Sequence, residues 1–253
     1  ILTGDHGPMF SHSYFTMTVH RLFSDNRNTP TSNHPPRSLG SSASRILDML
    51  DGEHYGVVAN HQQRRLLRLW IDAGAPYPGT YAALGCGAIG GYQQNKQVET
   101  DFDWPSTKVG AEVIQRRCAS CHQGNDVLPL SLSDERGVSF WRFSLDDPRL
   151  RLSRHIVFNL TEPKHSLILL APLAENSGGY ASCRNEQGEA HVSFADTNDE
   201  DYGRLLAMVQ AGKQRLNEIK RFDMPGFVPS EQYLREMRRF GILPPKTATA
   251  EQY

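Results

Sequence analysis

The sequence predicts a mainly α-helical protein with long loops. Several stretches carry apolar residues at three- and four-residue steps, the period of a helix with one buried face. Between these stretches, many of the 15 Pro and 21 Gly residues interrupt regular structure. A Cys-x-x-Cys-His run at residues 118–122 directly follows one of the predicted helices.

The first part of the chain contains one short and one longer predicted helix. Residues 1–40 show little periodicity, and residues 25–40, rich in Asn, Thr, Ser and Pro, are expected to form an irregular loop. Ser44 is expected to cap the short helix. The longer helix covers about residues 62–73, and Gly74 ends it because glycine readily adopts the left-handed backbone found after helices.

The second part contains three predicted helices and one buried segment. A helix over about residues 107–117 runs into the Cys-x-x-Cys-His motif. The segment 166–173 is apolar and expected to be buried. A long amphipathic helix covers about residues 201–221. A last helix begins after Pro229 and ends at Gly241.

Composition divides the chain into two units. The Gly-rich segment 76–91 lacks the spacing of a phosphate-binding loop and is expected to form close-packed turns. The polar residues that follow predict a linker at 93–105. We therefore expect a loop-rich first unit at 1–92 and a helical domain at 106–253.

The Cys-x-x-Cys-His motif is typical of a covalently attached c-type haem. Cys118 and Cys121 would form thioethers with the two vinyl groups, and His122 would be the proximal iron ligand. Its other ring nitrogen is expected to donate to a backbone carbonyl, for example near Pro129.

Zinc and a redox dithiol are the alternatives for the two cysteines. A structural zinc site needs four ligands, and the sequence has no second Cys-x-x-Cys pair. A thioredoxin-like dithiol follows a strand, whereas a helix is predicted before Cys118. Haem c is the favoured interpretation.

A six-coordinate haem needs a distal ligand, for which three residues are candidates. Met224 is the first choice, His155 the second and His191 the third. Arg154 precedes His155 and would place a positive charge near a haem propionate. His165 is expected to be exposed.

The order of these elements resembles the single-haem, class I cytochrome c fold. A helix precedes the motif, and a long helix, a Met-Pro pair and a final helix follow it. In this resemblance Pro225 holds Met224 over the haem, and the domain covers residues 106–241.

The composition limits the partners of the chain. Its formal net charge of −1 gives no strong field for nucleic acid or a membrane surface. The longest apolar run, 167–171, is too short to span a bilayer. The chain begins at Ile1, so we expect a processed product or part of a longer protein.

The cysteines indicate the cellular compartment in which the protein is expected to mature. Attachment of haem c implies an oxidising compartment outside the cytoplasm, such as the periplasm. There Cys86 and Cys183 either form a disulfide or remain two unrelated buried thiols.

Four runs resemble the C-terminal portion of the hydrazine synthase alpha subunit and its relatives in planctomycete-type bacteria. The runs are 68–85 (RLWIDAGAPYPGTYAALG), 116–122 (RRCASCH), 170–174 (LAPLA) and 219–227 (IKRFDMPGF). The resemblance implies that residues 1–92 are the tail of a middle cytochrome c-like domain. The reactive haem motif would lie upstream of Ile1.

The resemblance also implies a role for the haem. The family's reactive haem has a Tyr four residues after its motif His, but Asp126 takes that place here. Cys118, Cys121 and His122 therefore match the family's second haem, an electron-transfer haem with a distal His. An anammoxosome-like compartment would be expected of a true synthase.

Three functions remain open from sequence. The first is electron transfer with a redox partner protein or a neighbouring haem domain, with no catalytic residue in this chain. The second is a haem enzyme part acting on nitric oxide and ammonium. The third is a haem-free module with zinc at Cys118 and Cys121.

Overall fold

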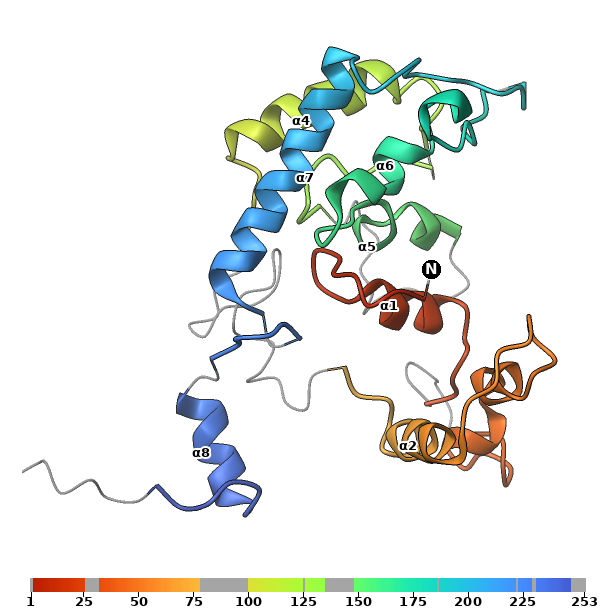
Figure 1. The fold of residues 1–253 in the computed structure, drawn as a ribbon, viewed down its shortest axis with the longest axis vertical. Helices are drawn as coiled ribbons and strands as arrows, with labels where there is room; N and C mark the ends of the chain where they lie inside the picture. The colour runs from red at the N-terminus through yellow and green to blue at the C-terminus, as the bar shows by residue number, and fades with distance from the viewer. Residues whose placement is uncertain are drawn as a thin grey trace, which may run out of the picture.

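The computed structural model describes residues 2–25, 32–77, 100–124, 126–134, 148–185, 187–221, 223–228 and 231–246. Within these ranges every regular element is a helix, and extended segments pair only through isolated bridges. The predicted mainly α-helical class is therefore confirmed for the described residues (Figure 1).

The α-helices differ widely in length. They are α1 (His12–Val19), α2 (His61–Asp72), α4 (Pro105–Arg117), α5 (Arg154–Val157), α6 (Leu167–Leu170), α7 (Glu200–Ile219) and α8 (Glu231–Arg239). Short 3-10 helices cover Gly40–Ala43, Arg45–Leu50, Pro148–Leu152, Pro163–His165 and Glu175–Ser177.

The four longer predicted helices are confirmed as α2, α4, α7 and α8. Asn60 caps α2 and forms a reciprocal capping box with Gln63. Pro105 occupies the first turn of α4, where its missing N–H costs nothing. The short helix expected after Ser44 is a 3-10 helix. Ser44 stands at its N-terminus, but the expected side-chain cap is absent because the Ser44 hydroxyl donates back to the Gly40 carbonyl.

Helix α1 was not predicted, and the polar residues on its buried face explain why. Its buried residues include His12, Thr16 and Thr18 beside Tyr14 and Phe15. Polar residues on the buried side remove the apolar periodicity on which a sequence prediction depends.

Helices α4 and α7 pack against each other and form the centre of the larger core (Figure 1). The cluster around them contains Val113 and Ile114 of α4, Leu205 and Met208 of α7, and buried side chains from residues 128–194. Helix α8 contributes nothing to this cluster among the described residues. The long helix, rather than the last one, therefore packs on the helix that leads to the motif.

Gly110 permits the close approach of the two helices. A Cβ atom at this position would lie 2.5 Å from Met208 Sδ and 3.1 Å from Met208 Cβ. Any larger residue must push α7 away or force Met208 out of its packed position.

Ion pairs fix the end of α4 to the beginning of α7. Arg116 donates to Asp201 at 2.6 Å, and Arg117 pairs with Asp199. Hydrogen bonds from Arg116 and Arg204 hold the pKa of Asp201 below its ordinary value. Carboxylates in the first turn of α7 are also favoured by the helix dipole.

The N-terminal segment joins a second cluster. Met9, Phe10 and Phe15 pack there with Ile71 of α2, and Leu150 joins from the second half of the chain. His12 Nε2 lies 2.9 Å from the Phe158 carbonyl oxygen, so α1 is tied to the end of α5.

Arg221 ties the same segment to the end of α7. It is fully buried, donates two 2.7 Å hydrogen bonds to Asp223, and donates a third to the Gly7 carbonyl at 2.9 Å. Tyr77 also donates to Asp223. Burial works to raise the pKa of Asp223, but the Arg221 charge and these hydrogen bonds lower it overall.

The described contacts thus link residues on both sides of the predicted linker. The division at 93–105 stays a prediction, because most of that segment lies outside the described residues. None of the described helices combines the length and apolar character needed to cross a bilayer.

We predict that Gly110→Ala destabilises the chain by about 1–3 kcal/mol because the new methyl group overpacks the α4–α7 crossing. The free energy of unfolding in urea measures the effect. Gly203→Ala on α7 is the matched control, since nothing lies within 4 Å of its Cβ position. That variant should be stabilised by about 0.4–1 kcal/mol. Equal effects at the two sites would show that the close approach does not matter.

Candidate functional site

The Cys-x-x-Cys-His motif forms a tight turn at the end of α4. The Cys118 N–H closes the helix on the Ile114 carbonyl at 2.9 Å. The Cys118 carbonyl then accepts from the N–H groups of Cys121, at 3.1 Å, and His122, at 2.9 Å. This turn brings both thiols and the imidazole to the wall of one cavity.

His122 has the hydrogen bond expected of a metal ligand. Its Nδ1 lies 3.0 Å from the Asp126 carbonyl oxygen. A carbonyl oxygen can only accept, so Nδ1 carries the proton and the Nε2 lone pair is left for a metal. The predicted backbone acceptor is therefore present, and it belongs to Asp126.

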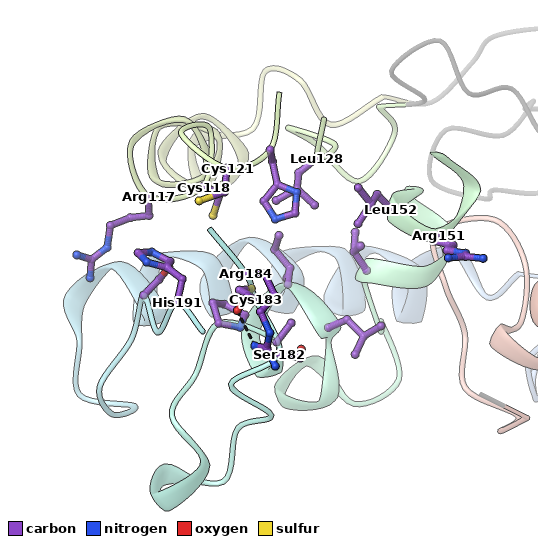
Figure 2. Close-up of a pocket in the computed structure, with 17 residues that line it drawn as sticks. Arg117, Cys118, Cys121, Leu128, Arg151, Leu152, Ser182, Cys183, Arg184 and His191 are labelled. Carbon is purple, nitrogen blue, oxygen red and sulfur yellow. Dashed lines mark hydrogen bonds between the residues drawn. The ribbon is translucent and has the colours of Figure 1, made fainter. Parts of the chain in front are cut away.

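The cavity has a volume of about 300 Å³, at the small end of the range for ligand pockets. Figure 2 shows Cys118 and Cys121 on the α4 side, and Ser182, Cys183 and Arg184 on the facing side. Aliphatic side chains form much of the lining: Leu128, Leu152, Val157, Leu167 and Ile168. The cavity therefore suits a ligand with a large apolar surface.

Three arginines, Arg117, Arg151 and Arg184, also line the cavity. Arg117 is already paired with Asp199. Arg151 and Arg184 have no carboxylate partner among the described residues, although Arg184 already donates to the Ala181 and Cys183 carbonyls at 2.9 and 2.8 Å. Both guanidinium groups keep further N–H donors for an anionic ligand. Arg154 is buried elsewhere and donates to the Leu132 carbonyl at 3.2 Å.

A narrow hairpin forms the wall opposite the motif. Arg184 and Ala190 form an antiparallel bridge, and the His191 N–H donates to the Cys183 carbonyl at 3.0 Å. This register places Cys183 directly opposite His191, so their side chains project from the same face of the ladder. Both side chains are half-buried and line the cavity.

The cavity holds three thiols. Burial raises the pKa of Cys118 to about 11, and the neighbouring thiols of Cys183 and Cys121 add to the shift. Burial also raises the pKa of Cys183, with a contribution from Cys121. All three are free thiols in this structure. Cys86 lies outside the described residues, so its pairing with Cys183 stays a prediction.

The structure brings one of the three distal candidates, His191, to the cavity. Met224 instead packs against the edge of the larger core. His155 packs against the rings of Phe10 and Phe15, with centroid separations of 5.2 and 4.7 Å. Its burial, followed by the charge of Arg154, lowers the pKa of His155 well below the ordinary value. His165 is exposed, as expected.

Sequence reasoning missed Cys183, Arg151 and Arg184 as cavity residues. Cys183 carries a usable signal, because Asn185 and Gly188 are typical turn residues between it and His191. No comparable signal identifies the arginines, since their place depends on how α5 and α6 pack.

The cavity residues are less suited to binding a metal ion without a haem. No group of three or more His, Cys, Asp or Glu side chains in the described ranges is arranged to hold one. The zinc alternative at Cys118 and Cys121 therefore lacks further ligands among the residues that the structure describes.

Comparisons with protein-family models, curated proteins and solved structures find no match to this chain.

We predict that in the haem-free chain iodoacetamide alkylates Cys121 faster than Cys118 near neutral pH. Cys118 is buried and its raised pKa keeps it a neutral thiol, whereas the thiolate is the reactive form. Peptide mass spectrometry after timed quenching measures both rates. Unfolding in urea is the control and should remove most of the difference. Faster modification of Cys118 in the folded chain would contradict the described burial.

Proposed function

We propose that this chain binds one haem c covalently and serves as an electron-transfer protein. One observation carries the proposal. Two thiols and an imidazole with a carbonyl-bonded Nδ1 line the same largely apolar cavity. These are the donors that a c-type haem requires, at the spacing it requires.

The residues of the cavity fit the cofactor in chemical type. Cys118 and Cys121 would supply the two thioether sulfurs, and His122 Nε2 would bind the iron. The aliphatic walls would cover the ring and exclude water, while Arg151 and Arg184 would meet the propionates. When bound, a haem c supplies one-electron oxidation and reduction at its iron.

We propose His191 as the ligand opposite His122. Of the three candidates from the sequence it is the one that lines the cavity, on the wall facing the motif. An imidazole there would give a low-spin, six-coordinate iron suited to electron transfer rather than to binding a small substrate.

The packing of α7 on α4 supports a cytochrome c-like domain with one change from the expected order. The wall opposite the motif, at residues 182–193, comes before α7 in the sequence, whereas Met224 comes after α7. A redox protein or a neighbouring haem domain is the proposed partner, in the periplasm or another compartment outside the cytoplasm.

We predict that the chain, produced together with a c-type haem attachment system, gains the mass of one haem that survives denaturation. The Cys118→Ser/Cys121→Ser double variant should lose this increment because both thioether sulfurs are gone. Ser120→Ala, which changes only an intervening position, should keep it. Intact mass spectrometry in acid measures all three. A wild-type chain of unmodified mass would overturn the proposed function.

We predict that His191→Ala makes the reduced haem protein high-spin and able to bind carbon monoxide, because the ferrous iron loses its distal ligand. His155→Ala and Met224→Ala should leave the low-spin visible spectrum unchanged, since neither residue lines the cavity. His165→Ala is the control for loss of an exposed imidazole. A high-spin product from Met224→Ala alone would restore the first choice from the sequence.

A further inference from the structure

The hairpin opposite the motif presents two ligand-type side chains to one cavity. Cys183 and His191 are directly opposed in the register set by the Arg184–Ala190 bridge and the 3.0 Å hydrogen bond between their backbones. In such pairs the Cβ atoms are about 4.5–5.5 Å apart and lie on one face. Cys183 and His191 therefore enter the cavity from adjacent positions, the Cys183 sulfur one bond from its Cβ and the His191 ring nitrogens further out.

The alternation of exposure along the hairpin supports this register. Cys183 and His191 are half-buried, whereas Arg184 and Val192, next to each of them, are exposed. Both side chains of the pair line the cavity, opposite the wall that carries Cys118 and Cys121 (Figure 2). With His122 as the ligand from the motif wall, this face would offer the remaining ligand of a bound haem iron.

We propose that Cys183 is a second iron ligand, which holds the distal position in the oxidised protein and yields it to His191 on reduction. This inference rests on the proposed function. Ferric iron favours an anionic thiolate, and ferrous iron favours the neutral imidazole.

The exchange balances as a one-electron, one-proton step. In the oxidised protein the Cys183 thiolate would be the bound ligand, its proton having passed to solvent. As the redox partner delivers one electron on reduction, the Cys183 sulfur would release the iron and take a proton back from solvent. His191 would then bind in its place through Nε2 or Nδ1.

The hairpin suits such an exchange because little has to move. The two ligands belong to one small ladder, whose backbone is held at Cys183, Asn185 and Glu189. The ladder is attached to the end of α6, where Ser182 donates to the Ala171 carbonyl at 2.9 Å. Side-chain rotation, rather than refolding of the wall, would exchange the ligands.

Electron paramagnetic resonance of the oxidised haem protein, with visible spectra of both oxidation states, tests the proposal. The wild-type chain should show a low-spin ferric signal with the narrow g spread of thiolate ligation, and a low-spin ferrous spectrum. Cys183→Ala should lose the thiolate signal, gain the wider spread of two imidazoles, and shift its reduction potential upward. His191→Ala should keep the thiolate signal when oxidised and become high-spin when reduced.

Ser182→Ala is the matched control, since it changes a neighbouring cavity residue without a strong ligand atom. Its signal should equal that of the wild type. A loaded chain whose ferric signal is the same in wild type and Cys183→Ala would overturn this inference alone. A chain that carries no covalent haem would overturn the proposed function and this inference together.

Discussion

The crossing of α4 and α7 is the constraint on which the candidate site depends. Gly110 lets the two helices approach until Met208 fills the space above it. Arg116 and Arg117, in the last turn of α4, then reach Asp201 and Asp199 at the beginning of α7. Since Cys118 is the next residue, this crossing fixes the start of the motif turn. The loop that leads into α7 carries the facing wall, so both sides of the cavity are positioned by one helix pair.

Both walls of the cavity are held by backbone hydrogen bonds. On the motif wall the Cys118 carbonyl accepts from two backbone N–H groups, and the Asp126 carbonyl orients the His122 ring. On the facing wall the hairpin is closed by the His191–Cys183 and Asn185–Glu189 bonds and is attached to Ala171 through Ser182. Such a frame suits a cofactor that is anchored on one wall and meets ligand-type side chains on the other.

Most helices were predictable because their signals are local. Apolar spacing and end residues locate α2, α4, α7 and α8 within a few positions. Helix α1 was not, because its buried face includes His12 and Thr16, whose place depends on tertiary packing. The proximal half of the site was equally local, since five adjacent residues contain the cysteines and the histidine.

The distal half could not be derived in the same way. Both α7 and α8 follow the motif and both are amphipathic, so the sequence allowed either to pack on α4. The Met-Pro pair between these two helices made Met224 the first choice from the sequence. The structure gives that position to α7, where Met208 matches Gly110, and the wall opposite the motif then comes from residues 182–193. When segments far apart in sequence form a cavity, their packing determines which side chains face it.

The proposed function requires that Cys118 and Cys121 both attach to one haem in this cavity. The pyridine haemochrome spectrum of the purified, denatured chain tests it most directly, because the α band moves with each vinyl group that becomes a thioether. We expect the band position of a haem with two thioether bonds, at one haem per chain. A band at the position of unattached haem, or no band, would contradict it.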